Sequence, residues 1–196
     1  IFATQVSGTL QVAGLHAQLK TQRMEEQATL LQISRVFLTV HAPQEIMDIA
    51  VQEAARALNV ELAAIALVDE GGKTYSGRAN INWPQEIFQY TQGIPIDADT
   101  GLGYAIRERI PVAISDESTE TRFGVPPWAE QMGIVSSLLL PIVLDEKVVG
   151  GIIANSRVAR HWNEDEVCLL SLIANITAQA LERARLVSAQ KERLLS

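Results

Sequence analysis

Hydrophobic and polar positions divide the chain into a helical start, a central region of short strands and a helical end. From Ile1 to about Val40 there is no proline, and apolar residues return at three- and four-residue steps, which is the period of an amphipathic helix. Two seven-residue lines run through this stretch: Leu10, Ala17, Met24, Leu31 and Leu38, and a companion line of Val6 and Ala13 that turns polar at Lys20, Gln27 and Ser34. They predict an imperfect coiled-coil seam. A further stripe of Leu30, Ile33 and Phe37 predicts docking on a globular core.

A second helix is predicted from Pro43 to about Leu58, because proline fits the first turn of a helix and Ala42 can precede it as a weak cap. The pattern then changes to short apolar runs. Val60 to Val68 and Lys73 to Ile81 flank the turn signal Asp69-Glu70-Gly71-Gly72 and predict a hairpin. A clearer hairpin is predicted for Ser136 to Leu144 and Val148 to Asn155, joined by Asp145-Glu146-Lys147.

The segment between the hairpins predicts shorter elements. These are a short helix or loop over 84–92, an extended segment over 94–96, a helix over 100–109, a strand over 112–114, an irregular stretch over 115–127 and a helical turn over 128–132. Asn163 is expected to cap a closing helix with an acidic first turn, which the helix dipole favours. Strands in two antiparallel pairs with helices before and after predict an α+β fold, one antiparallel sheet with helices packed on a face.

Composition narrows the class of protein. The chain has 196 residues, 47% hydrophobic and 20% charged, enough for one domain with extra helix. A net charge of -7 disfavours binding to nucleic acid. The single cysteine, Cys168, excludes an internal disulfide and a Cys-rich zinc site. No uninterrupted apolar run reaches the ~20 residues that span a bilayer, and no signal peptide is evident. We therefore expect a cytoplasmic fragment of a longer protein, without direct membrane contact.

The two ends of the chain resemble each other when position n is compared with position n + 171. The matching pairs are Ala3 with Ala174, Leu10 with Leu181, Ala13 with Ala184, Leu15 with Leu186 and Lys20 with Lys191. Two helices with small and aliphatic stripes can look alike by chance. The alternative is that residues 1–20 close a preceding domain of the same kind, in a tandem array.

Several ordered segments resemble the GAF domain, a small-molecule sensor module of signalling proteins. They are Gly101-Leu-Gly-Tyr-Ala-Ile-Arg-Glu-Arg-Ile-Pro-Val, Ile114-Ser-Asp, Ser136-Ser-Leu-Leu-Leu-Pro-Ile-Val-Leu, Lys147-Val-Val-Gly-Gly-Ile-Ile and Trp162-Asn-Glu-Asp-Glu-Val-Cys-Leu-Leu. The resemblance implies a profilin-like fold with a six-stranded antiparallel sheet. It also implies a pocket roofed by residues 94–132, and terminal helices on the other face that join a partner subunit and signal to an output domain such as a histidine kinase. The expected divisions are a linker helix (1–27), the GAF domain (28–186) and an outgoing helix (187–196).

The residues disfavour the specialised chemistries of GAF domains. Bilin attachment and free methionine sulfoxide reduction require pocket cysteines, whereas Cys168 is expected to be an apolar core thiol in the closing helix. Haem is disfavoured because His16, His41 and His161 lie off the predicted pocket strands. No metal-ligand cluster, phosphate loop or catalytic triad is evident, so no catalytic residue and no metal site is predicted, and any cofactor is unknown.

A partial cyclic-nucleotide signature is present. Asn155, Trp162 and Asp165-Glu166 match the family pattern, but Ser156 replaces its lysine and Arg157 follows. The alternative is a strand end and a helix cap joined by an Arg157–Asp165 ion pair, which leaves cyclic-nucleotide binding open.

Polar and aromatic residues between 94 and 128, with inward strand residues, could orient a ligand in an apolar cup. The candidates are Tyr75, Tyr104, Asp116, Arg122, Phe123, Trp128 and Ser137. Alternatively, Phe123 and Trp128 only cover the core, Asp116 only accepts hydrogen bonds in its turn, and Arg122 is solvated or paired with Glu117 or Glu120. We expect a non-catalytic sensory domain that binds a small molecule and forms a homodimer through its terminal helices. The alternative is a structural dimerisation module without a ligand.

Overall fold

The computed structural model describes residues 37, 40 and 42–195. The chain divides into two compact units, Ile1–Thr39 and Val40–Ser196, and the second carries nearly all of the described residues. The predicted coiled-coil seam and the leading half of the repeat lie outside the described residues.

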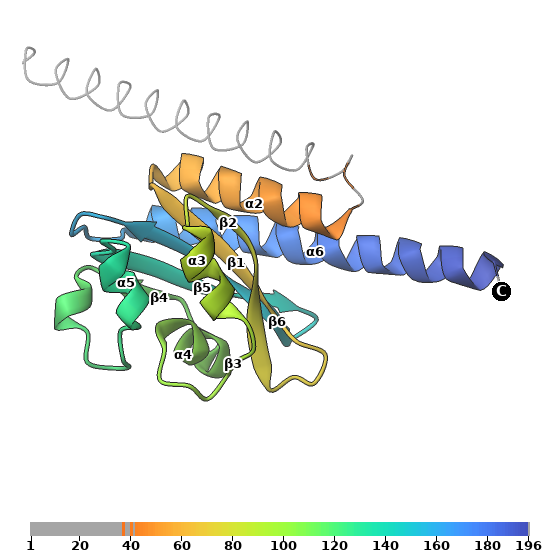
Figure 1. Cartoon of the computed structure of the whole chain (residues 1–196). Coiled ribbons are helices and arrows are strands. Elements are labelled where there is room, and N and C mark those ends of the chain that lie inside the picture. The colour runs from red at the N-terminus through yellow and green to blue at the C-terminus, as the bar shows by residue number, and fades with distance from the viewer. Residues whose placement is uncertain (1–36, 38–39, 41, 196) are drawn as a thin grey trace, which may run out of the picture. The chain divides into compact units, whose positions relative to one another are not determined.

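Six antiparallel strands form one sheet in the order β3-β2-β1-β6-β5-β4, which confirms the predicted fold class (Figure 1). Their bounds are β1 Leu62–Val68, β2 Thr74–Ile81, β3 Ile94–Pro95, β4 Val112–Ile114, β5 Ser136–Leu144 and β6 Lys147–Ser156. Both predicted hairpins, β1–β2 and β5–β6, are present and pair with each other through β1 and β6.

Two long helices cover one face of the sheet: α2 (Pro43–Leu58) and α6 (Glu164–Leu195). The core on this side is aliphatic, with fully buried Ile46, Ile65, Leu138, Leu140, Ile152 and Ile173. The other face is covered by shorter elements: α3 (Gln85–Phe88), η1 (Gln89–Thr91), α4 (Gly101–Glu108), η2 (Glu117–Thr119) and α5 (Pro127–Gln131). The sheet therefore has one face packed by long helices and one covered by short segments.

Local chemistry explains where the elements begin and end. Thr100 caps α4, since its Oγ1 accepts a hydrogen bond from Gly103 N at 3.1 Å. At the start of α6, Asn163 Oδ1 accepts from Glu166 N at 2.9 Å, and Glu166 Oε2 accepts from Asn163 N at 3.0 Å. This reciprocal pair is a capping box and confirms the predicted cap.

The β5–β6 turn is one residue shorter than predicted. Asp145 and Glu146 both have positive φ, at 46° and 63°, and Lys147 pairs with Leu144 as the first residue of β6. A two-residue loop with positive φ at both positions has the twist that suits a hairpin. Residues other than glycine seldom adopt positive φ, and without a glycine the sequence does not mark Asp145-Glu146 as a two-residue turn.

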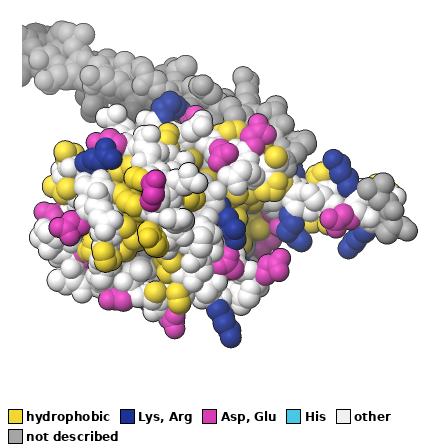
Figure 2. All heavy atoms as spheres, in the orientation of Figure 1, with side chains coloured by type: hydrophobic (Ala, Val, Ile, Leu, Met, Phe, Trp, Pro, Cys, Tyr) yellow, Lys and Arg dark blue, Asp and Glu magenta, His cyan; other side chains and the backbone are white. Residues whose placement is uncertain are grey.

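Among the described residues, α6 is long and apolar enough to cross a membrane by length and composition alone. Its large apolar side chains Leu170 and Ile173 are fully buried, and the helix packs on β5 and α2. Core helices pass the same length and composition test. On the face drawn in Figure 2, acidic and basic side chains are interspersed and do not form a patch of one sign.

Candidate functional site

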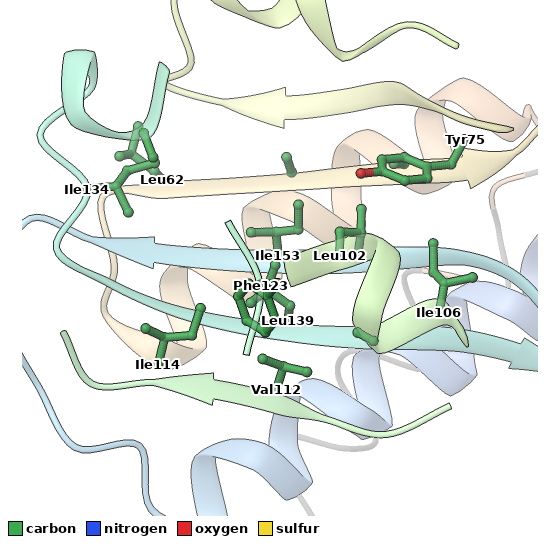
Figure 3. Close-up of a cluster of buried hydrophobic side chains, with 14 of the residues drawn as sticks. Leu62, Tyr75, Leu102, Ile106, Val112, Ile114, Phe123, Ile134, Leu139 and Ile153 are labelled. Carbon is green, nitrogen blue, oxygen red and sulfur yellow. The ribbon is translucent and has the colours of Figure 1, made fainter. Parts of the chain in front are cut away.

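Strand register places two polar side chains in an apolar row on the face opposite α2 and α6. Asn155 of β6 pairs with Leu62 and with Ser137, and Ser137 pairs with Ile114. The next row, two residues along each strand, is entirely apolar: Ala64, Ile153, Leu139 and Val112. In Figure 3, Ile153 and Leu139 of this face lie near Leu102 of α4 and Phe123, within one cluster of buried side chains.

A cavity of about 100 Å³ lies between this face and its covering segments. Its wall is mainly apolar and includes five aromatic residues, Tyr75, Trp83, Phe88, Phe123 and Trp128. Its polar side chains are Thr91, Thr100, Glu117, Ser137 and Asn155. Among the described residues, none that lines this cavity is Lys, Arg or His.

A chain of three polar side chains forms one wall of the cavity. Asn155 Nδ2 donates to Ser137 Oγ at 2.8 Å, and Ser137 Oγ donates to Glu117 Oε1. Asn155 is 3% exposed, and its Oδ1 has no hydrogen-bond partner in the described part of the chain. The amide has two polar ends; Ser137 engages the Nδ2 end and gives its own hydrogen to Glu117, so the Oδ1 end is the one left unpaired.

The Glu117 carboxyl has a pKa above its usual value. Burial raises its pKa, the hydrogen bond from Ser137 opposes this rise, and the nearby carboxylates of Glu120 and Asp116 add to it. Desolvation and like charges both disfavour the carboxylate. The cavity wall therefore carries a carboxyl that accepts a proton more readily than a solvated one.

Trp83 supplies a second unpaired polar atom. The side chain follows β2 and is 6% exposed, and none of the residues that the structure describes pairs with its Nε1. Its ring packs against Trp128 and Phe88, with centroids 5.0 Å and 6.2 Å away. By contrast, Trp162 Nε1 donates to Ile114 O at 3.1 Å. Buried indole N–H groups usually have such a partner, so Trp83 is the exception.

Four of the seven predicted ligand residues line the cavity: Tyr75, Phe123, Trp128 and Ser137. Tyr75 is fixed by a 2.9 Å hydrogen bond between its hydroxyl and Thr100 Oγ1, and burial raises its pKa. Whether these residues touch a ligand stays a prediction.

The other three lie outside the lining. Tyr104 packs on Phe123 with centroids 5.4 Å apart. Asp116 Oδ1 accepts hydrogen bonds from Ser118 Oγ at 2.6 Å and from Ser118 N at 2.9 Å, and these two bonds lower the pKa of Asp116. Arg122 Nη2 lies 2.6 Å from Glu120 Oε2. For Asp116 and Arg122 these are the turn and ion-pair roles named above as alternatives.

Sequence reasoning did not select Trp83 and Glu117, and considered Asn155 only within the nucleotide signature. No local pattern distinguishes Trp83, because its role follows from the neighbours that leave its N–H unpaired. Asn155 did carry a signal: it is a polar residue two positions after Ile153 in an apolar strand, which places both side chains on one face.

The remainder of the nucleotide signature is structural. Trp162 bonds Ile114, and Glu166 belongs to the capping box and pairs with Arg160. The predicted Arg157–Asp165 pair is wrong, because Arg157 Nε donates to Met132 O at 3.1 Å.

Cys168 is exposed on α6, so its prediction as a core thiol is also wrong. Neither Cys168 nor the exposed His161 lines the cavity. His16 and His41 lie outside the described residues.

The family model and the solved structures that are similar to this chain point to the same family. A family model described as "GAF domain" matches residues 42–181. No curated protein matches the chain. Among solved structures, the GAF domain of a phosphoenolpyruvate-protein phosphotransferase from Coxiella burnetii has a TM-score of 0.73 at 16% identity, over 85% of this chain and 98% of that one.

Two signalling proteins are also similar. A methyl-accepting chemotaxis protein has a TM-score of 0.69 at 21% identity, over 80% of this chain and 99% of that one. A domain assigned to a two-component sensor histidine kinase from Sinorhizobium meliloti 1021 has a TM-score of 0.64 at 17% identity, over 78% of this chain and 99% of that one. At these identities the likeness is one of fold.

Proposed function

This chain belongs to the GAF domain family, and from that premise we propose that it is a non-catalytic sensory domain that binds a small molecule in the cavity between β-sheet and covering segments. GAF domains are typically sensory or regulatory modules. The ligand would be held by the apolar wall and oriented by the few polar groups of that wall, as in most small-molecule sites.

The observation that carries this proposal is that two residues of the cavity lining each have a buried polar atom without a partner among the described residues. Trp83 Nε1 is a donor and Asn155 Oδ1 an acceptor, and both residues are more than nine-tenths buried. A buried polar group without a partner is costly, and native proteins keep few of them. A ligand that bonds both atoms would remove that cost and would gain affinity from it.

A thermal-shift screen of small metabolites tests this function. A ligand that binds only the folded state raises the melting temperature with its concentration. The library should span neutral, anionic and cationic molecules and both cyclic nucleotides, cAMP and cGMP. A saturable rise that is lost when Ser137→Leu fills the cavity supports the proposal. No rise from any compound at millimolar concentration contradicts it.

The domain that would receive the signal is proposed from the kinds of protein in which similar folds occur. Similar folds occur in a chemotaxis protein and in a domain assigned to a histidine kinase. We propose that residues 28–186 are the sensor and that residues 1–27 and 187–196 belong to helices that form a homodimer and relay the signal. The output domain would be one such as a histidine kinase, and the location cytoplasmic.

A second candidate function is a structural dimerisation module without a ligand. The specific observation that favours it is the size of the cavity, about 100 Å³, whereas ligand pockets usually measure roughly 300–1,000 Å³. Under this alternative the screen gives no stabilisation, while the chain still dimerises.

A further inference from the structure

The ligand proposed above can be narrowed to a chemical class, and this step rests on the proposed function. We propose that the cavity binds a small, neutral, planar ring of the azole type, which accepts a hydrogen bond from Trp83 Nε1 and donates one to the Glu117–Ser137–Asn155 chain. Three properties of the cavity lead to this class.

Polarity is the first property. Trp83 can only donate through its indole N–H, and Asn155 Oδ1 can only accept. Neither atom has a hydrogen-bond partner among the described residues. A ligand that satisfies both must therefore carry an acceptor and a donor. An azole such as pyrazole has a ring nitrogen that accepts and an adjacent N–H that donates.

Charge is the second property. None of the described residues that line the cavity is a cation, and Glu117 contributes a carboxyl. The nearby Arg122 is already held by Glu120 at 2.6 Å and lies outside the lining. A buried anion needs a paired positive charge, so a carboxylate or a phosphate ester would be bound at a penalty here. The site therefore disfavours an anion, and burial of Glu117, which disfavours its carboxylate form, also weakens the pairing that a cation would need.

Size and shape are the third property. An engineered apolar cavity of about 150 Å³ binds benzene, a ring of six atoms, so the cavity offers about 25 Å³ for each ring atom. On that measure a cavity of about 100 Å³ takes about four or five ring atoms. A nucleotide or a tetrapyrrole would require the covering segments to move. The aromatic side chains of Trp83, Trp128 and Phe123 give the cavity flat walls, against which a planar ring stacks well.

The test follows the indole N–H signals of the three tryptophans in a nitrogen–proton correlation spectrum of the whole chain. Trp83→Phe, Trp128→Phe and Trp162→Phe assign the signals. The probes are pyrazole, thiophene as a five-membered ring without an N–H, acetate as a small anion, and cAMP. Trp162 is the matched control, because its N–H is already bonded to Ile114 O and its side chain is not part of the cavity lining.

The expected result is that pyrazole shifts the Trp83 signal saturably and leaves the Trp162 signal in place. Trp83→Phe and, independently, Asn155→Leu should each weaken pyrazole binding about tenfold, the effect of one hydrogen bond. Affinity should be unchanged in Trp162→Phe. Thiophene should bind at least about tenfold more weakly than pyrazole, because it can make neither bond.

Two results overturn the inference and leave the proposed function standing. One is that acetate or cAMP shifts the Trp83 signal while pyrazole does not. The other is that thiophene binds as tightly as pyrazole, which would show that the two polar atoms select nothing. If no probe shifts any signal and the thermal-shift library is also silent, the inference and the sensory function fail together.

Discussion

At the scale of single residues, the same side chain has opposite roles at two buried positions. Trp83 keeps its N–H unpaired beside the cavity, while the N–H of Trp162 joins the start of α6 to β4 through Ile114 O. The energetic consequence of removing each N–H should therefore differ, even though both rings are almost fully buried.

Trp83→Phe should leave the free energy of unfolding nearly unchanged once the smaller ring is allowed for, because no hydrogen bond is lost. Trp162→Phe should lower it by about 1–3 kcal/mol more, since Ile114 O then loses its donor in the interior. Urea unfolding of both variants checks this. Equal losses at the two positions would contradict the assignment of Trp83 Nε1 as unpaired.

Glu117 should make stability depend on pH in the direction opposite to most carboxylates. Its pKa is raised from 4.5, above all by burial, so the folded state holds the proton more tightly than the unfolded state. The stabilisation is complete below the unfolded pKa and is lost as the pH rises through the folded pKa. The stability of the native chain relative to Glu117→Gln should therefore fall from acidic to neutral pH in urea unfolding.

Glu120 is the matched control for this pH dependence. Its pKa is lowered from 4.5 to about 2, mainly by the hydrogen bond from Arg122. Its stabilisation is present above the unfolded pKa and is lost as the pH falls toward the folded value. The stability of the native chain relative to Glu120→Gln should rise with pH over that acid range. Slopes of the same sign for both glutamates would contradict the opposite environments.

At the scale of elements, the closing helix depends on its first turn. Asn163→Ala removes one half of the capping box with Glu166 and should lower the free energy of unfolding by about 1 kcal/mol. Asn175→Ala is the control, because Asn175 is exposed within α6 and alanine is the better helix former. Chemical denaturation should show a loss for the first variant and none for the second.

The β1–β6 contact in the centre of the sheet requires a residue without a side chain at Gly150. A Cβ there would lie 2.3 Å from Ala66 O, a backbone atom that cannot turn away. Gly150→Ala should cost about 1–3 kcal/mol through overpacking. Gly71→Ala, in the β1–β2 turn where a Cβ meets nothing within 4 Å, should leave the melting temperature nearly unchanged. A melting temperature that is also unchanged in Gly150→Ala would contradict this packing.

At the scale of the whole molecule, α6 carries exposed apolar side chains near its end, with Leu186 54% and Leu194 79% exposed. The proposed homodimer would cover them. Light scattering should find a dimer at roughly tens of micromolar, where a micromolar contact assembles. Leu186→Lys should shift the chain toward monomer, while Val158→Lys, at another exposed apolar position, should not. A monomeric native chain would contradict the dimer.

Much of the fold could be predicted from the sequence because its signals are local. The bounds of α2, β4 and β5 match the predicted ranges, since Pro43 fixes a helix start and turn residues flank the short apolar runs. The predictions that were wrong concern residues whose neighbours in the sequence do not indicate how the residue packs in the folded chain. Cys168 has apolar neighbours along the chain, but it lies two residues before the buried Leu170, about 200° around the helix, and is therefore exposed.

The sequence by itself determined the elements, their order and the apolar character of the sheet, because helix and strand periodicities are encoded within a few residues. Only the tertiary structure decided the site. Glu117, Ser137 and Asn155 come from three places in the chain: strand register pairs Ser137 with Asn155, and η2 places Glu117 against Ser137 to complete the hydrogen-bonded chain. An unpaired N–H such as that of Trp83 is defined by what surrounds it in space, which no local pattern specifies.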